Sequence, residues 1–375
     1  MRNSATGRSV RAGLYVHVPF CRTKCAYCDF YSVTERDTEG QWLAAAGREA
    51  TLYKDRFAGP FNSIYIGGGT PTSLSDGQLA ALFEMLRREF AFSLDCEVTV
   101  EANPDDVDEG RLKMLGALGC NRLSFGIQSF DDGELALLKR RHNADRAARA
   151  IEAAKTAGFS NIGLDLMYGL PGQTMAGWRA ALERALSFGP AHLSCYQLTL
   201  EGRTPLALMV SAGELVLPAE EEVRALFLET SRLLKAAGFI HYEVSNFALP
   251  GRTCRHNEKY WGHVPYLGLG PSAHSFDSRT RWWNHRSLKA YIGAALAGER
   301  PVASHEALSA GQIELERLYL GLRTRRGIRL ADVKEKSLPA VRELRRAGLL
   351  RLRNGRLVPS PAGYLVADSL PALLS

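Results

Sequence analysis

Short apolar runs rich in β-branched and aromatic residues alternate with longer stretches of helical periodicity over the first 200 residues. The predicted strands are residues 14–18, 63–66, 97–101, 122–126, 161–166 and 192–198. The helical patterns between them include residues 38–56, 76–88, 144–157 and 175–186, with Gly or Pro breaks at their ends. Because parallel strands need crossover connections, six such units predict an open or partial (β/α)6 barrel, in which reactive groups gather at the carboxyl ends of the strands.

The alternation weakens after residue 201. A helix is predicted at 219–237 and a short strand at 240–244, and a segment rich in Gly, His and aromatic residues then runs from 245 to 285. The end of the chain predicts a small, mostly helical domain, with helices at 313–322, 330–335 and 340–347 and a hairpin around Asn354-Gly355. We therefore expect four regions: a tail (1–12), a barrel core (13–205), an extension of the barrel (206–300) and a C-terminal domain (301–375).

The composition argues against a membrane-spanning or secreted protein, and the charge is uneven along the chain. No apolar run approaches the roughly 20 residues that a bilayer crossing needs, and the N-terminus lacks the pattern of a signal peptide. We therefore expect a cytoplasmic protein. The net charge of +7 is concentrated in residues 301–375, which hold 13 Lys/Arg and 7 Asp/Glu. A solvated helix surface explains this, while an acidic partner or an anionic membrane face is also compatible. The C-terminal domain faintly suggests a winged helix but lacks a recognition-helix signature, so no specific nucleic acid is expected.

Three of the seven cysteines follow the first predicted strand as Cys21-x3-Cys25-x2-Cys28. A short loop of this spacing can put one thiolate on each of three irons of a [4Fe–4S] cube, whereas full protein ligation takes four Cys. The fourth iron is then open, as catalytic metal sites leave a position for substrate. A zinc site completed by Asp29 or His17 is the main alternative. A disulfide is less expected in a cytosolic protein.

Glycine and polar residues follow the later strands at the ends where barrel sites form. The run 67–71, Gly-Gly-Gly-Thr-Pro, would let a ligand approach the backbone, although a tight turn needs glycine equally. Glu101 ends the third strand, Gln128 follows the fourth, and Arg140 lies twelve residues further on. Asp165 stands inside an apolar strand, where a carboxylate is costly unless it is paired or binds something.

The cysteine spacing on the first strand of a partial barrel resembles the radical SAM superfamily, in which S-adenosylmethionine (SAM) chelates the open iron. Segments 15–21, 67–72, 125–130 and 165–174, in this order, resemble the oxygen-independent coproporphyrinogen III oxidase family and its relatives. The resemblance implies a [4Fe–4S] cluster on the three cysteines. It also implies a SAM site lined by Tyr15, Gly68, Gly69, Thr70, Glu101, Gln128, Arg140 and Asp165. Arg140 would meet the methionine carboxylate, and Glu101, Gln128 and Asp165 would serve the ribose.

Phe30 separates two branches of this family. The true oxidases carry a further cysteine two residues after the third and usually a longer N-terminal segment, whereas this chain has Phe30 and reaches Cys21 almost at once. Residues 254–261 resemble the His-Asn-x-x-Tyr-Trp signature of the HemW group, the haem chaperones, and residues 268–276 also resemble them. The resemblance implies a chaperone that delivers haem to acceptor proteins, including respiratory ones. The alternative is a coproporphyrinogen III dehydrogenase or another radical SAM enzyme acting on a tetrapyrrole.

Haem needs an axial ligand, usually His or Cys, and a flat apolar surface for its ring. The candidate haem-binding residues are His256, Asn257, Tyr260, Trp261 and Cys254. Residue types alone favour local hydrogen bonding by the His and Asn, with the aromatic side chains in the core; the family resemblance reverses that preference. Weaker candidate ligands are His263, His274 and His285. Expected partners are haem, haem-accepting proteins and a second copy of the chain, with docking at the inner face of the membrane.

Overall fold

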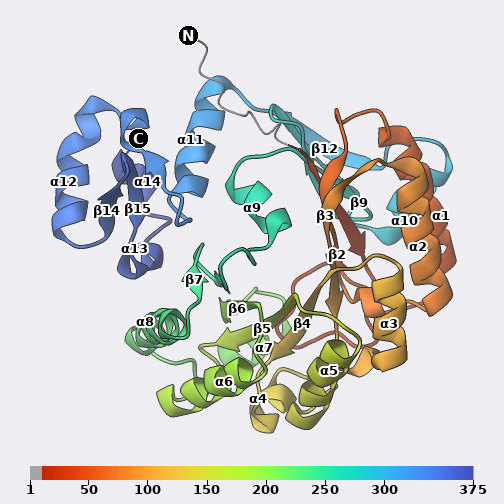
Figure 1. Ribbon diagram of the computed structural model, residues 1–375, viewed down its shortest axis with the longest axis horizontal. Helices are drawn as coiled ribbons and strands as arrows, with labels where there is room; N and C mark the ends of the chain where they lie inside the picture. Colours follow the sequence, from red (N-terminus) through yellow and green to blue (C-terminus); the bar gives the residue numbers. More distant parts are fainter. Residues whose placement is uncertain (1–10, 375) are drawn as a thin grey trace.

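The computed structural model describes residues 11–374, so nearly all of the expected tail lies outside the described residues. Six parallel strands form the centre of the fold: β1 (Gly13–Val18), β2 (Phe61–Gly68), β3 (Phe92–Ala102), β4 (Arg122–Gln128), β5 (Ile162–Tyr168) and β6 (His192–Gln197). Each pairs with the next in chain order. Figure 1 shows this sheet curving into an open barrel with its helices outside. The predicted partial (β/α)6 barrel is thus confirmed.

The outer helices are α1 (Glu39–Tyr53), α2 (Asp76–Glu89), α3 (Glu109–Ala117), α4 (Asp132–Leu137), α5 (Ala144–Thr156), α6 (Met175–Ser187), α7 (Pro205–Ser211) and α8 (Glu220–Ala236). Strand side chains alternate between the two faces of the sheet. In β1, Leu14, Val16 and Val18 are fully buried in the apolar core shared with these helices. Tyr15 and His17 therefore point the other way, into the barrel, as do their polar counterparts on the neighbouring strands.

Residues 238–307 extend the sheet at both edges. The added elements are β7 (Ile240–His241), β8 (Asn246–Ala248), α9 (Arg255–Trp261), β9 (Tyr266–Leu269), β10 (His274–Phe276), β11 (Thr280–Asn284), α10 (Leu288–Leu296) and β12 (Val302–Ala307). Within residues 11–374 the large sheet has twelve strands, ordered β12-β11-β10-β9-β1-β2-β3-β4-β5-β6-β8-β7. The sequence named no strand between 245 and 301, because strands this short show too few alternations to detect. β12 begins inside the range 301–375, yet it pairs with β11 in the large sheet.

The C-terminal part contains α11 (Ala310–Gly321), β13 (Ile328–Arg329), α12 (Leu338–Arg346), β14 (Leu350–Arg353), β15 (Arg356–Pro359), α13 (Pro361–Leu365) and α14 (Leu370–Leu374). It has its own apolar cluster and stands beside the barrel in Figure 1. The predicted hairpin is confirmed, with Asn354 and Gly355 at φ of 50° and 73°, as a type I′ turn requires. The helix predicted at 330–335 is wrong: two 3₁₀ turns replace it (Leu330–Asp332 and Glu335–Ser337), because so short a segment gains little from α-helical hydrogen bonds.

No helix among residues 11–374 has the length and apolarity that a bilayer crossing needs. The extension is instead tied to the barrel by a buried carboxylate on α1. Glu49 accepts hydrogen bonds from the Gly270 backbone N–H at 2.9 Å, the Asn284 Nδ2 at 2.5 Å and the Tyr291 hydroxyl at 2.6 Å. Burial raises the pKa of Glu49 to about 7, while the three donors act in the opposite direction. One side chain thus links α1 to the β9–β10 turn, β11 and α10.

We expect Glu49→Ala to lower the free energy of unfolding by about 2–4 kcal/mol, since it removes the acceptor of three buried hydrogen bonds. Urea denaturation followed by tryptophan fluorescence measures this loss. Glu84→Ala, which removes an exposed carboxylate on α2, is the matched control and should match the unsubstituted chain within error. Equal stability of the two variants would contradict the anchoring role of Glu49.

Candidate functional site

A cavity of about 570 Å³ opens at the carboxyl ends of the parallel strands. The predicted residues that line it are Cys21, Cys25, Cys28, Gly68, Gly69, Thr70, Glu101, Gln128, Arg140 and Asp165. They come from the loop after β1, from β2 to β5 and the turn that follows β2, and, for Arg140, from the segment after α4. The structure therefore brings together every residue predicted for the cluster and for SAM except Tyr15.

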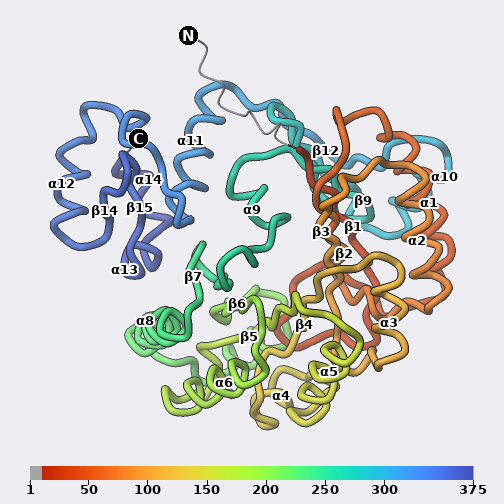
Figure 2. The backbone as a smooth tube through the Cα atoms, in the orientation of Figure 1, coloured from red at the N-terminus to blue at the C-terminus, as the bar shows by residue number. Residues whose placement is uncertain are grey.

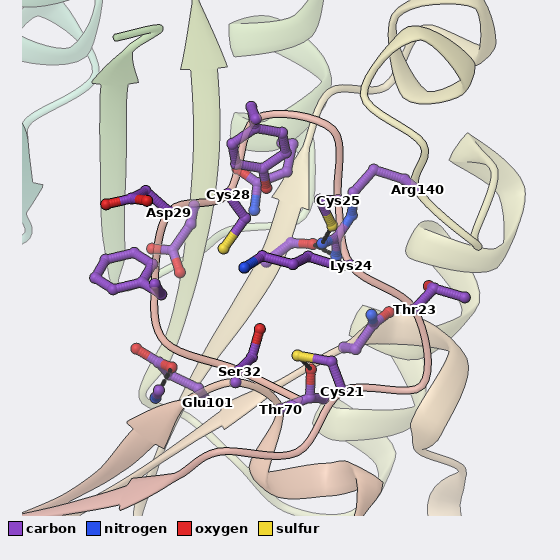
Figure 3. A pocket seen from close by; sticks show the side chains of 18 of the residues that line it. Cys21, Thr23, Lys24, Cys25, Cys28, Asp29, Ser32, Thr70, Glu101 and Arg140 are labelled. Carbon is purple, nitrogen blue, oxygen red and sulfur yellow. Dashed lines mark hydrogen bonds between the residues drawn. The ribbon is translucent and has the colours of Figure 1, made fainter. Parts of the chain in front are cut away.

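The loop that carries the three cysteines is closed at its base. The Cys21 N–H donates to the Val33 carbonyl at 2.9 Å, and the Val33 N–H donates to the Pro19 carbonyl at 2.7 Å. Figure 3 shows the sulfur atoms of Cys21, Cys25 and Cys28 facing the space that the loop encloses. All seven cysteines are free thiols, so the disulfide alternative is wrong for this structure.

The structure also shows where the residues proposed for a zinc site lie. Among the described residues, no three His, Cys, Asp or Glu side chains converge as ligands of one ion would. His17, one of the two alternative zinc ligands, is 5% exposed and engaged elsewhere, with Nδ1 3.0 Å from the Tyr15 hydroxyl and Nε2 2.9 Å from the Tyr31 carbonyl oxygen. Asp29, the other, lines the cavity. Burial raises the pKa of Cys28 to about 11, so metal binding would release its proton.

The glycine run after β2 is required by close packing of the chain itself. Gly68 has φ of 110°, and a Cβ there would lie 2.6 Å from the His17 ring. A Cβ on Gly67 would lie 2.8 Å from the Glu101 carboxyl group. The tight-turn interpretation therefore holds locally, and Gly68 and Gly69 line the cavity as well. Bare backbone at this turn lets the carboxylate of Glu101 reach the cavity.

Two carboxyl groups are held at the cavity wall by donors. Glu101 accepts from the Tyr65 hydroxyl at 2.8 Å and the Gly68 N–H at 3.0 Å, and burial raises its pKa to about 7. Asp165 accepts from the Ser124 hydroxyl at 3.2 and 3.3 Å, and burial raises its pKa too. Each carboxyl group has further lone pairs for ligand hydroxyls. Sequence analysis did not identify Tyr65, although the alternation of β2 places it on the inner face, two residues before Gly67.

Arg140 bridges the cluster loop and β4. Its Nη1 lies 3.2 Å from the Cys25 sulfur and its Nη2 donates to the Gly126 carbonyl at 2.6 Å. Its buried Nε has no partner among the described residues, so one donor of this cation is left for a ligand carboxylate. Gln128, at the end of β4, has φ of 68°, a strained conformation for a residue with a side chain. Strain at a cavity wall is typical of a binding site.

Tyr15 lies outside the set of residues that line the cavity. It precedes His17 by two residues on the same face of β1, so it sits one inward position deeper in the barrel. Its ring lies 6.3 Å from the Tyr65 ring and 6.4 Å from the His256 ring. Tyr15 therefore lies between the cavity and the second candidate site.

That second candidate site is on α9, which lies inside the open barrel against β1 and β2 (Figure 2). His256 is 1% exposed, with Nδ1 3.1 Å from the Ser63 hydroxyl and Nε2 2.9 Å from the Tyr260 hydroxyl. Burial, then the charges of Lys259 and Arg122, lower the pKa of His256 to about 3, so its imidazole is neutral. In this conformation it makes the local hydrogen bonds that residue types alone favoured.

The remaining candidates for haem surround His256. Cys254 is a buried thiol 3.7 Å from the Glu97 carboxylate, and burial raises its pKa to about 12. Trp261 packs under the Arg323 guanidinium, 5.6 Å from the ring centre, and Asn257 is partly buried. The segment meets the amino-terminal half of β1 and β2, at Gly13 and Ser63. It therefore lies at the opposite end of the barrel from the cysteines.

The fold and the cavity define a radical SAM protein. Residues 15–185 match the Radical SAM superfamily, and residues 308–366 match the HemN C-terminal domain. The solved structure of the coproporphyrinogen III oxidase HemN from Escherichia coli has a TM-score of 0.83, covering 97% of this chain and 90% of that chain. Its sequence identity is 24%, so this likeness shows the fold alone.

Curated relatives define the family further. The chain is 37% identical to the haem chaperone HemW of Mycobacterium tuberculosis over 96% of this chain and 93% of that protein. It is 36% identical to HemW of Bacillus subtilis, over 95% and 97% respectively. The chain therefore belongs to the HemW family of the radical SAM superfamily. Membership of that superfamily implies a [4Fe–4S] cluster and SAM, and the three facing thiols, the free Arg140 Nε and the two carboxyl groups fit them.

We expect Cys28→Ala to lose most of its cluster after anaerobic reconstitution, because three thiolates are the protein ligands of the cube. Iron and acid-labile sulfide should fall from about four to below about one per chain. Cys96→Ala removes a partly buried thiol of β3 outside the cavity and is the matched control. A full cluster in Cys28→Ala would contradict the ligand assignment.

Arg140→Ala and Asp165→Asn should each weaken SAM binding to the cluster-loaded protein about 10- to 100-fold, since each removes a charged hydrogen-bonding partner. Equilibrium dialysis with labelled SAM measures the Kd. Arg149→Ala, on the exposed face of α5, should leave it unchanged. Wild-type affinity in both cavity variants would mean that SAM binds elsewhere.

Proposed function

We propose that this protein is a haem chaperone that binds haem and a SAM-ligated [4Fe–4S] cluster and delivers haem to acceptor proteins, respiratory haem proteins among them. The observation that carries the proposal is the similarity to HemW proteins over almost the whole chain. The His-Asn-x-x-Tyr-Trp residues on α9 support it, because they combine a ligand with flat aromatic surface. Haem is the cargo in this proposal, and the cluster and SAM are resident cofactors.

The environment of Phe30 supports delivery of haem over oxidation of a porphyrinogen. Phe30 lines the cavity and is 71% exposed, at the position where the oxidases carry a fourth cysteine. An apolar ring there contributes no thiol chemistry. It presents instead a hydrophobic surface beside the cluster loop.

Loading haem on His256 requires α9 to move, because both ring nitrogens of His256 are engaged and the side chain is buried. The helix is seven residues long, and its polar contacts with β2 and β3 would have to be released or exchanged. Glu97 accepts the backbone N–H groups of Arg255 and His256, both at 3.2 Å. Lys259 donates to the Arg11 carbonyl and to Asn62 at 2.9 and 2.5 Å. In the proposed cycle these contacts release, and the iron replaces one hydrogen bond of His256.

A chain of contacts inside the barrel joins the cavity to α9. The Tyr65 hydroxyl donates to Glu101 at the cavity, and the Tyr65 ring lies 5.5 Å from the ring of His256. The cluster with SAM supplies a redox-active, ligand-binding centre when bound. In this proposal the occupancy of the cavity adjusts haem binding or transfer through Tyr65, rather than driving a turnover of substrate.

The C-terminal part is proposed to contribute to docking on acceptors. Residues 301–375 hold 13 Lys/Arg against 7 Asp/Glu, which favours an acidic protein or an anionic membrane face. The Arg323 guanidinium lies over the Trp261 ring and so connects the C-terminal part to α9. Docking could thereby influence α9. Association of two copies of the chain is proposed as well, and sedimentation with and without haem tests it.

Haem titration of the anaerobically reconstituted protein should give a Soret band that saturates at a defined stoichiometry. His256→Ala should bind haem at least about 10-fold more weakly, because the axial ligand is lost. His305→Ala removes an exposed histidine of β12 that is not a candidate ligand, and is the matched control. Far-UV circular dichroism checks that both variants fold.

Two results would contradict the proposed function. One is a wild-type protein that takes up no haem, or a His256→Ala variant that binds haem as the wild type does. The other is formation of protoporphyrinogen when the protein is incubated anaerobically with coproporphyrinogen, SAM and a reductant. That product would identify an oxidase despite Phe30.

A further inference from the structure

The barrel interior contains a buried cation that the proposed function has not used. Arg122, the first residue of β4, is 1% exposed, and its Nε and Nη1 have no hydrogen-bond partner among the described residues. Within residues 11–374 no carboxylate lies at ion-pair distance of Arg122, and the charges of Glu97, Glu101 and Asp165 act on it at longer range. A buried guanidinium without partners is costly, so this one calls for an acceptor.

Further donors converge near Arg122 around the missing side chain of Gly163. A Cβ on Gly163 would lie 3.3 Å from the Arg122 Nη2 and 3.5 Å from the His192 Nδ1. His192 is buried and its pKa is lowered well below the usual value, by burial and then by the Arg122 charge, so the ring is neutral. Its Nε2 lies 2.8 Å from the Tyr242 hydroxyl. When that hydroxyl donates to Nε2, the Nδ1 carries the proton. That Nδ1 has no partner among the described residues.

The chemistry of this group, which we call the Arg122 site (Arg122 and His192 around Gly163), is that of an anion receptor. It offers a buried cation and a neutral N–H donor. The hydroxyl of Thr99, paired with Arg122 in the β3–β4 register, also lacks a partner among the described residues. A carboxylate suits donors of this kind, because it accepts several hydrogen bonds and Arg matches its geometry.

The Arg122 site lies in the same barrel interior as α9, which carries the candidate haem ligand His256. The Arg122 charge acts on Cys254 and on His256, the two candidate ligands of α9. Glu97 also acts on the Arg122 charge at longer range, and in this conformation its oxygens accept from Cys254 and from the backbone of Arg255 and His256. Haem has a matching shape. It is an apolar ring with an iron at its centre, which takes an axial ligand, and with carboxylates at one edge.

We propose that the Arg122 site binds a carboxylate, and that this carboxylate is a propionate of the haem carried by the α9 segment. The inference rests on the proposed function for the identity of the cargo. A small free carboxylate has the same chemistry, so the experiment separates the two sources. The site would orient the haem ring, with iron toward His256 and one propionate toward β4.

The decisive comparison uses the wild-type holoprotein with haem and with haem dimethyl ester, which keeps iron and ring but lacks free carboxylates. Soret titration should show haem binding about 10- to 100-fold more tightly than the ester, the range for loss of a charge-assisted hydrogen bond. Arg122→Gln should reduce this preference to about twofold or less, and Arg122→Lys, which keeps the cation, should restore part of it.

A second variant tests the space without removing the charge. Gly163→Ala places a methyl group between Arg122 and His192 and should also reduce the preference for haem over its ester. Gly116→Ala, on α3 and 3.8 Å from its nearest neighbour Phe159, is the matched control and should keep the wild-type preference. Near-UV circular dichroism checks folding. The wild-type comparison decides the case even where Arg122→Gln does not fold.

Equal wild-type affinities for haem and its ester would overturn the inference while leaving the proposed function intact. Absence of any haem binding would overturn the proposed function itself. An Arg122→Gln variant that folds and keeps the full preference would also sink the assignment. Acetate titrated against haem should compete in the wild type but not in Arg122→Gln. Acetate binding at Arg122 without a haem-over-ester preference would assign the site to a small free anion and overturn the propionate assignment.

Discussion

Every second side chain of β1 to β6 points into the barrel, and in this chain many of those side chains are polar. The outward residues, such as Leu14 and Ile66, bury apolar area against the helices and hold the sheet in its curve. The inward residues inherit that curvature and face one another across a space with little water. Electrostatic interactions and hydrogen bonds are strong there, and a polar group that is left without a partner is costly. Both the cysteine cavity and the α9 site follow from this single constraint.

The two ends of the barrel interior differ in which groups pair with their polar side chains. At the carboxyl end, Glu101 and Asp165 are already supported by Tyr65 and Ser124, so a ligand meets groups that are held in place. At the amino end, α9 itself fills the barrel and supplies partners for Ser63 and Glu97. A ligand there must exchange with protein groups. The carboxyl end therefore suits a cofactor that stays bound, whereas the amino end suits a ligand that exchanges with the groups of α9.

The sequence predicted those features that depend on local spacing. The cysteine triplet, the six central strands and the Asn354-Gly355 turn are each encoded within a few residues. The strands β9 to β11 were missed because each has only three to five residues, and the 330–335 helix was wrong because six residues rarely sustain one alone. Tyr65 and Arg122 were missed for another reason. Their roles depend on strand register and on which residues face each other across the barrel, and neither is visible in a single segment.

The hydrogen bonds of His256 bear on how a carrier can release its cargo. In the proposed function, iron occupies one imidazole nitrogen, and on release that nitrogen returns to Ser63 or Tyr260 rather than staying bare. A buried nitrogen left without a partner costs about 1–3 kcal/mol, so these hydroxyls lower the cost of the empty state by a similar amount. Removing them would therefore tighten haem retention while weakening the empty fold. On this argument the burial of His256 is compatible with haem delivery, because a carrier needs its empty state to be stable.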